Sequence, residues 1–230
     1  MKKAEKFLVV DIETCNKVED ALAYDIGLVV TDRRGNIYHE ASYLLYDTFV
    51  LEKSLMKSAY YAVKIPEYEK ELSEGKHKLC QILTVKREIE RLMEEYSIKK
   101  VFAYNANFDY SGLNRTLRYI TKSRIRWFFP YGTEIQCIWS FACSILAERS
   151  TYGKFCEEHG YISNKGKHYK SSAEVVYQYI TKNPFFSEGH KGLEDVRIEA
   201  EILAWCYSRK TKVETSINRA CWRKLTRETS

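Results

Sequence analysis

The chain has 230 residues, of which 45% are hydrophobic and 30% charged, with only three prolines and ten glycines. This composition excludes a long disordered or low-complexity chain and favours one compact globular domain. The formal net charge of +6 at pH 7 excludes a strongly acidic protein and favours an anionic partner such as a phosphate backbone.

The N-terminal region and the cysteines indicate the cellular location. Only four apolar residues, 7–10, follow a charged start, whereas a signal peptide needs a longer apolar stretch and a membrane span needs about 20 apolar residues. The seven cysteines include no C-x-x-C pair, so reduced thiols are favoured over a disulfide framework or a zinc site at Cys156, His159 and His168. We therefore expect a cytoplasmic protein without a membrane partner.

Three strands are predicted in the first 45 residues. The apolar run 7–10 indicates a buried strand that ends in acids, and 24–30 and 37–45 are further strand-like runs. The polar turn 31–36 contains a glycine and an asparagine that accept positive φ, so the last two strands are expected to form a hairpin. The next stretch, 51–62, is expected to be helical.

The middle of the chain alternates irregular, helical and extended patterns. Residues 65–80 are polar and contain Pro66 and Gly75 as breakers, so we expect a mobile surface segment there. A helix with an apolar stripe begins at Thr84, and 101–104 is a short strand that leads into another helix.

The C-terminal half is predominantly helical. An extended segment is expected at 126–131, and Ser171 or Ser172 can cap one of the later helices. These later helices are predicted at 137–148, 151–159, 172–182 and 193–207. Strands followed by helices that alternate with further strands indicate an α/β domain around a mixed sheet.

The composition changes near residue 208. We expect a domain over 1–208 and a basic C-terminal extension over 209–230, in which seven Lys or Arg residues accompany only two glutamates. Such an extension is either a solvated tail or a segment that binds nucleic acid or a partner.

Acidic residues stand at the end of the first strand. Asp11 and Glu13 are two positions apart and therefore project to the same face of a strand, whereas Ile12 points away. Two neighbouring carboxylates at a buried strand end repel each other and lose hydration, which is costly unless protonation, a basic partner or a cation relieves it. An exposed strand end with ordinary acids is the structural alternative.

Two later elements each carry a further acid. Asp109 follows a strand near the start of a helix, at the sheet edge where α/β proteins bind ligands, unless it only complements the helix dipole. Asp195 belongs to the last helix, and His190 lies in the loop or first turn before it. Gly192 separates them and allows an unusual backbone turn, so both side chains can reach one pocket.

The order and spacing of these elements carry a family resemblance that spans about 11–207. In chain order, the three motifs are Asp11-x-Glu13-Thr14, Asn105-x-x-x-Asp109 and His190-x-x-x-x-Asp195. They resemble the motifs of the DEDDh exonucleases. This family is the proofreading-subunit-like group of the ribonuclease-H-like superfamily. The first and third motifs are the specific ones. The resemblance implies an α/β fold with a ribonuclease-H-like mixed sheet and an antiparallel hairpin, flanked by helices.

Several positions bear on the subfamily. Many members have histidine where this chain has Tyr104, and alanine where it has Gly192, a small-for-small change that we expect to be tolerated. A sister subfamily has tyrosine four residues before the last acid, where Lys191 stands here, so the histidine subfamily fits better. Residues 24–27 and the hairpin also resemble members encoded by bacteriophages.

The resemblance implies a metal-dependent 3′→5′ exonuclease that releases nucleoside 5′-monophosphates from DNA or RNA. Two divalent ions, Mg²⁺ or Mn²⁺, suit oxygen ligands and phosphodiester hydrolysis. The implied metal ligands are four catalytic carboxylates, of which the first bridges the ions: Asp11, Glu13, Asp109 and Asp195. His190 is the implied base, because an ordinary pKa of about 6.5 leaves it largely neutral. Thr14 and Asn105 are the implied contacts to the terminal nucleotide.

Two alternatives keep the fold but change the function. A binding module without turnover would work through the basic C-terminus, although it has no need of four converging acids, and an endonuclease would cut within a strand. The expected partner is nucleic acid with a free 3′ end, in single-stranded form, because backbone contacts and aromatic stacking suffice to bind it. The choice between DNA and RNA, the oligomeric state, and a polymerase or other protein partner stay open.

Overall fold

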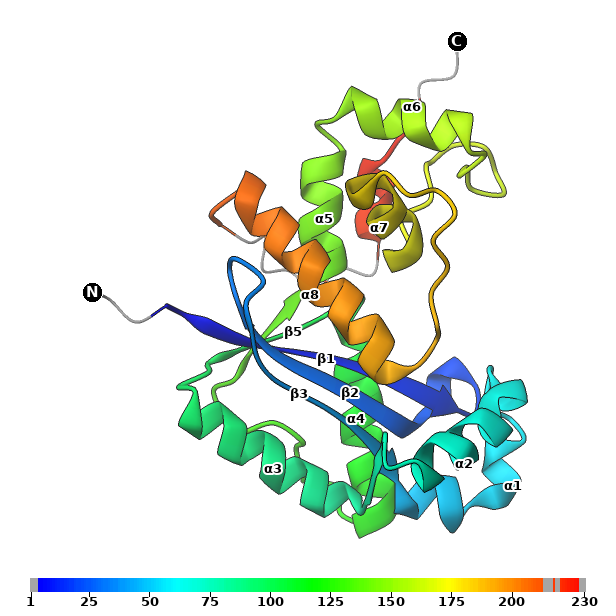
Figure 1. Ribbon diagram of the computed structural model, residues 1–230, viewed down its shortest axis with the longest axis vertical. Coiled ribbons are helices and arrows are strands. Elements are labelled where there is room, and N and C mark those ends of the chain that lie inside the picture. The colour runs from blue at the N-terminus through cyan, green and yellow to red at the C-terminus, as the bar shows by residue number, and fades with distance from the viewer. Residues whose placement is uncertain (1–3, 213–216, 218–219, 228–230) are drawn as a thin grey trace.

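A six-stranded mixed sheet forms the centre of the molecule in the computed structural model, which describes residues 4–212, 217 and 220–227 (Figure 1). In sheet order the strands are β4 (Lys78–Cys80), β3 (Ile37–Leu45), β2 (Leu22–Asp32), β1 (Lys6–Cys15), β5 (Lys100–Ala103) and β6 (Glu134–Cys137). Strand β2 pairs antiparallel with both β1 and β3. The other pairs are parallel: β4 with β3, β5 with β1 and β6 with β5. The predicted α/β class, mixed sheet and hairpin are therefore confirmed.

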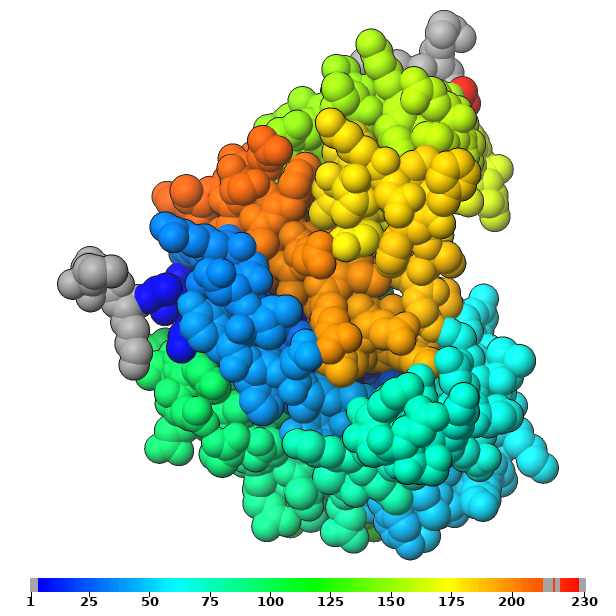
Figure 2. Space-filling model, viewed as in Figure 1, coloured from blue at the N-terminus to red at the C-terminus, as the bar shows by residue number. Residues whose placement is uncertain are grey.

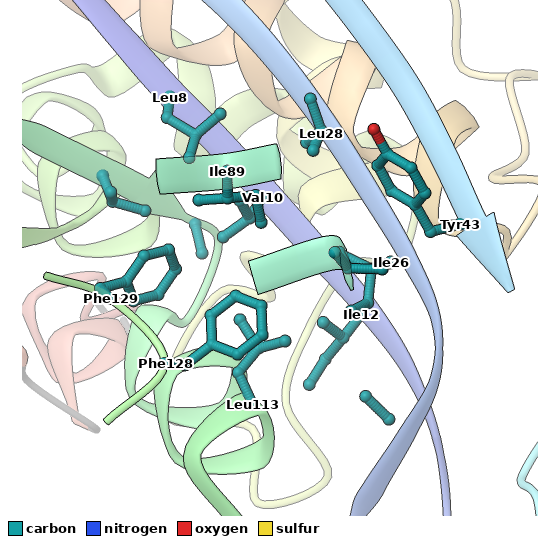
Figure 3. Packing of buried hydrophobic residues seen from close by; sticks show 14 of the residues in the cluster. Leu8, Val10, Ile12, Ile26, Leu28, Tyr43, Ile89, Leu113, Phe128 and Phe129 are labelled. Atoms are coloured by element: carbon teal, nitrogen blue, oxygen red, sulfur yellow. The ribbon is translucent and has the colours of Figure 1, made fainter. Parts of the chain in front are cut away.

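Helices cover both faces of the sheet. Side chains of the first three strands, such as Leu8, Leu28 and Tyr43, pack on one face against Ile89 and Leu113 (Figure 3). The helices on that face are α3 (Ile82–Glu95) and α4 (Ala106–Thr121). The other face packs against α8 (Gly192–Arg209), with α5 (Ile138–Leu146), α6 (Ser150–Glu158) and α7 (Ala173–Thr181) beyond it (Figure 1).

Side-chain alternation along β1 decides where its acids point. Leu8 packs toward α3 and α4, whereas Phe7 and Val9 pack toward α5 and α8. Because alternate residues of a strand share a face, Asp11 and Glu13 project toward α8. The β1–β2 register shifts directly after Glu13, and the pairing continues in the new register at Thr14 and Cys15.

The region between β3 and α3 differs from the prediction. The helix expected over 51–62 is reduced to the short α1 (Lys53–Met56), which lies between η2 (Tyr46–Val50) and η3 (Ala62–Lys64). The prediction of an irregular segment at 65–80 is wrong, because α2 (Ile65–Ser73) and β4 form there. Pro66 opens α2, since the first turn of a helix has no use for the N–H that proline lacks. Tyr68 is fully buried and anchors α2.

The later helices follow the sequence pattern closely. The helices predicted from Thr84 onward are confirmed with ends shifted by one or two residues, and 126–131 is a loop. Ser172 caps α7, because its Oγ accepts a hydrogen bond from the Val175 N–H at 3.4 Å. β6 lacks a distinctive sequence pattern and was not expected.

The predicted extension 209–230 is only partly described. Outside the described residues lie 1–3, 213–216, 218–219 and 228–230. The short helix η4 (Cys221–Lys224) packs on the α8 side of the sheet, where Cys221 and Leu225 are buried. No helix within the described residues is long and apolar enough to cross a membrane.

Candidate active site

The first turn of α8 rests directly on the backbone of β2. Gly27 of β2 pairs in the sheet with Asp11 of β1. A Cβ on Gly192 would lie 2.6 Å from the Gly27 nitrogen, and a Cβ on Gly27 would overlap the Gly192 carbonyl. This backbone contact brings Asp195, in the first turn of α8, toward Asp11. This close approach requires a residue without a Cβ at both positions.

Asp25 stabilises the same contact with hydrogen bonds. Its buried carboxylate accepts the N–H of Gly192 at 2.9 Å, the hydroxyl of Tyr68 at 2.9 Å and the hydroxyl of Ser42 at 3.3 Å. An acid at a helix N-terminus also interacts favourably with the helix dipole. Asp25 thus joins β2, β3, α2 and α8 at the edge of the site.

Lys191, the residue before α8, ties the same helix to α2. Its buried ammonium group lies 2.7 Å from the carboxylates of Glu67 and Glu71, on successive turns of α2. The surfaces of α2 and of the first turn of α8 meet accordingly (Figure 2). These two ion pairs explain how a segment as polar as 65–73 becomes an ordered helix.

The glycine contact predicts the effect of a small substitution. We expect Gly27→Ala to lower the free energy of unfolding by about 1–3 kcal/mol, because the added methyl group must separate α8 from β2. Calorimetry should show a lower Tm. Gly192→Ala fills the same gap, so the double variant should lose less than the sum of the two single losses. Strictly additive losses would contradict a shared contact.

Carboxylates from three elements meet beside this contact. Oxygens of Glu13 and Asp195 and a ring nitrogen of His190 all lie within 4.8 Å of one another. Burial, followed by the charges of Glu199, Asp109, Glu13 and Asp195, raises the pKa of Asp11 well above its ordinary value. The structure therefore gathers every residue that the sequence assigns to catalysis: Asp11, Glu13, Asp109, His190 and Asp195.

The acids of this group oppose one another's ionisation. Burial, followed by the charge of Asp195, raises the pKa of Glu13 to about 8. Burial likewise raises the pKa of Asp109 to about 8 and that of Asp195 to about 7. At neutral pH the site therefore holds protons in place of charge, unless a cation compensates the carboxylates.

Three of the carboxylates have an oxygen poised for a ligand. Asp11 Oδ2, Asp109 Oδ2 and Asp195 Oδ1 are buried and find no hydrogen-bond partner among the described residues. Such an oxygen costs about 1–3 kcal/mol, and more when it is charged. Clustered carboxylate oxygens are the ligands that Mg²⁺ and Mn²⁺ prefer. The residues present thus fit a divalent-cation site.

Two more acids belong to the site. Glu199 is 3% exposed, and its Oε2 accepts the N–H of Tyr104 at 3.1 Å. It lies one helical turn after Asp195, and this i, i+4 spacing is a sequence signal that places both on one face. Glu188 lies in the loop before α8, where burial raises its pKa to about 8 and where no periodicity could have indicated it.

His190 has a left-handed backbone, with φ of 51°. The unusual turn therefore lies at His190 itself, and the prediction that Gly192 supplies it is wrong. The His190 ring stacks on Tyr61 with centroids 4.2 Å apart and planes 13° apart. Burial, followed by the charge of Lys64, lowers the pKa of His190, so the ring is neutral at neutral pH.

Two clefts meet at the carboxylates. The larger has a volume of about 710 Å³, and its wall includes Asp11, Asn105, His190 and Asp195. The smaller, of about 530 Å³, is lined by Glu13 and Thr14 among others. Tyr61 and Phe108 line both clefts and so form their common wall. Thr14 and Asn105 therefore flank the carboxylates, each in a different cleft.

Aromatic side chains form another part of the wall of the larger cleft. Tyr104 and Trp139 stack with centroids 6.4 Å apart, and Trp222 packs edge-on against His168 at 4.8 Å. Trp222 belongs to η4, so the described part of the C-terminal segment contributes to this cleft. Flat apolar faces beside clustered acids suit a ligand that has both rings and phosphates.

The raised pKa values predict how stability depends on pH. In the absence of divalent cations, Glu13, Asp109 and Asp195 bind protons in the folded state at pH values where the unfolded chain, with pKa near 4, has lost them. The free energy of unfolding should therefore fall as pH rises from about 4 to 8.

Denaturant titrations across this pH range measure the slope. Asp109→Asn removes one titrating group, so we expect a shallower slope and a more stable protein at pH 8. Mg²⁺ should flatten the wild-type slope, because a bound cation replaces the protons. Identical slopes in wild type and Asp109→Asn would contradict the raised pKa of Asp109.

Known proteins of similar structure share this architecture. No protein-family model and no curated protein matches the chain. The chain is similar to E. coli exonuclease I in complex with a dT13 oligonucleotide, at 14% identity and a TM-score of 0.57, over 90% of this chain and 42% of that chain. It is also similar to a product-bound structure of exonuclease I, at 13% identity and a TM-score of 0.55, over 91% of this chain and 44% of that one.

These similarities concern the fold. The chain spans about two fifths of the length of the exonuclease I structures that it matches. The match extends over 90% of this chain. The chain therefore has the ribonuclease-H-like fold of exonuclease I.

Proposed function

We propose that the chain is a metal-dependent 3′→5′ exonuclease that hydrolyses phosphodiester bonds at the 3′ end of DNA or RNA and releases nucleoside 5′-monophosphates. The observation that carries this proposal is the meeting of Asp11, Glu13, Asp109 and Asp195 beside His190, with three buried oxygens that lack a partner among the described residues. The fold shared with exonuclease I, which has been solved with dT13 and dA16 oligonucleotides, supports it.

The four carboxylates would hold two divalent cations, Mg²⁺ or Mn²⁺. Asp11, Glu13 and Asp195 would bind one, and Asp11 and Asp109 the other, so that Asp11 is shared. Bound there, the cations would lower the pKa of the attacking water and neutralise charge on the phosphoryl oxygens. The buried carboxylates would orient these ions and exclude bulk water around them.

His190 would accept the proton of the attacking water at a ring nitrogen. Its lowered pKa keeps it neutral, as a base must be, and stacking on Tyr61 fixes the plane of the ring. The Glu188 carboxyl group lies 4.0 Å from the His190 Nδ1, within reach of the imidazolium that would form. The proton would then leave through the open side of the cleft.

The two clefts would hold the 3′ end of a single strand. Thr14 and Asn105 would contact the terminal nucleotide from either side of the carboxylates. Tyr61, Phe108 and Trp139 offer ring faces on which bases of any sequence can stack. Base identity would not need to be read.

Lys191 supports assignment to the histidine, or DEDDh, type. The related subfamily has a tyrosine at this position, whereas the Lys191 ammonium points away from catalysis into its ion pairs with Glu67 and Glu71. His190 is therefore the base within reach of the acids. A cytoplasmic location and the bacteriophage origin suggested by residues 24–27 stay predictions.

Oligonucleotides of one sequence, as DNA and as RNA, test the proposal in a single metal titration. With Mg²⁺ or Mn²⁺ and a free 3′ end, we expect a 5′-labelled strand to shorten stepwise and a 3′-labelled strand to release mononucleotide. Blocked 3′ ends and circular strands should survive. Robust activity in EDTA would contradict the mechanism.

Two other outcomes would favour the alternative functions. Cleavage of the circle would indicate an endonuclease that uses the same carboxylates. Tight binding with no hydrolysis under either cation would indicate a binding module. The oxygens of the carboxylate group that lack partners favour turnover over the binding module, since a binding surface gains nothing from them.

A further inference from the structure

A second groove, separate from the carboxylate clefts, is lined by α4 and the loop after it. Its volume is about 740 Å³. Its lining is basic, aromatic and polar, with no acid among the described residues: Tyr110, Ser111, Asn114, Arg115, Arg118, Tyr119, Lys122, Ser123, Arg124 and Trp127. We call it the basic groove. Its charge is opposite to that of the carboxylate clefts and favours an anionic ligand.

The positive charges of the basic groove are not neutralised within the protein. Arg115 donates to the carbonyl of Ala21 at 3.1 Å and Arg118 to the carbonyl of Arg126 at 3.0 Å, so both are positioned by neutral partners. None of the groove's four basic residues forms an ion pair within the described part of the chain. Arginines elsewhere on the surface, at positions 91, 197 and 227, pair with glutamates.

Aromatic rings lie directly among these charges. Trp127 is 55% exposed and stacks on Tyr110, with centroids 6.2 Å apart and planes 18° apart. The Arg118 guanidinium lies 4.4 Å from the Trp127 ring, and the Lys122 ammonium 4.3 Å from the Tyr119 ring. Exposed rings beside unpaired cations match the bases and phosphates of a single nucleic-acid strand. An acidic peptide would use the cations and leave the rings without a role.

Helix α4 connects the basic groove to the carboxylates. Phe108 and Asp109, in its first turn, belong to the candidate active site, whereas Arg118 and Lys122 lie at its far end. At 1.5 Å per residue, Asp109 and Lys122 are about 20 Å apart along the helix. A stacked strand with one phosphate per 3.4 Å covers that distance in about six nucleotides.

We propose that the basic groove is a second binding site for single-stranded nucleic acid, which holds the strand on the 5′ side of the end bound at the carboxylates. The direction of the strand rests on the proposed function. The binding itself does not, because it depends only on the charges and rings of the groove.

Binding of fluorescent dT20, measured by anisotropy in EDTA, tests the proposal without turnover. The test variant is Lys122→Gln with Arg124→Gln, two exposed residues whose side chains form no hydrogen bond within the described residues. If each contacts one phosphate, the slope of log affinity against log salt should fall by about 1.4, which is about 25-fold in affinity at 0.1 M salt. Trp127→Ala should weaken binding at least about 5-fold with an unchanged slope, because stacking releases no counterions.

The matched control is Arg87→Gln with Lys99→Gln, which removes the same charge at exposed positions outside the grooves described above. It should bind dT20 within about 3-fold of wild type, since only general attraction is reduced. Wild-type affinity in the test variant, or an equal loss in the control, would overturn the proposal. So would binding of an Asp/Glu decapeptide that depends on Lys122 and Arg124 while dT20 binding does not.

Discussion

Asp11→Asn is expected to lower the rate of single-strand hydrolysis by about 10³-fold or more at saturating Mg²⁺. The substitution keeps the shape of the side chain but removes the charge that we assign to both cations. Charge stabilisation by a bound metal is worth several kcal/mol in the transition state, and each 1.36 kcal/mol is a factor of ten in rate. Initial rates with a 3′-labelled strand measure the loss.

A control separates this loss from damage to the fold. Asp20→Asn is the same chemical change at an exposed position in η1 (Val18–Asp20), and it should keep wild-type activity. Without cations, Asp11→Asn should melt no lower than wild type, because it relieves repulsion from Glu199, Asp109 and Glu13. Hydrolysis by Asp11→Asn at the wild-type rate would show that catalysis does not require Asp11.

His190→Gln is expected to lower the same rate by about 10²–10⁴-fold, the usual contribution of a general base. Glutamine preserves polarity and much of the volume but cannot accept a proton at neutral pH. Cation binding should persist, because the four carboxylates remain. His159→Gln, at an exposed position outside the clefts that hold the carboxylates, is the matched control and should leave the rate unchanged.

The pH profile distinguishes a base from a structural residue. Burial lowers the pKa of His190, so wild-type activity should stay level near neutral pH and fall only as the pH drops through that lowered value and the ring becomes protonated. The acidic limb that belongs to His190 should be absent from the residual activity of His190→Gln. If His190→Gln keeps the same acidic limb, the limb belongs to another titrating group.

The sequence predicts most of the fold because its local and tertiary signals agree. Strand β1 is an apolar run, and α3 carries an apolar stripe, so each pattern leads to the observed element. The segment 65–80 could not be predicted in this way, because α2 buries only Tyr68 fully and relies on ion pairs from Glu67 and Glu71 to a lysine more than a hundred residues later. Such long-range pairs leave no periodic pattern.

The candidate site is predictable for a different reason. Its acids stand at strand ends and helix starts, where the topology of an α/β sheet brings distant segments together. The roles of Asp25 and of the Gly27–Gly192 contact could not be derived, because they depend on how closely α8 approaches β2. Glu199 lies at helical spacing from Asp195 and could have been found.

The position of bound cations tests the central claim most directly. Crystals grown with Mn²⁺ can be examined in an anomalous difference map, which locates the metal independently of activity. We expect two peaks about 3.5–4 Å apart, enclosed by Asp11, Glu13, Asp109 and Asp195, with Asp11 between them. A map with manganese elsewhere on the protein and no peak among these four carboxylates would contradict the account.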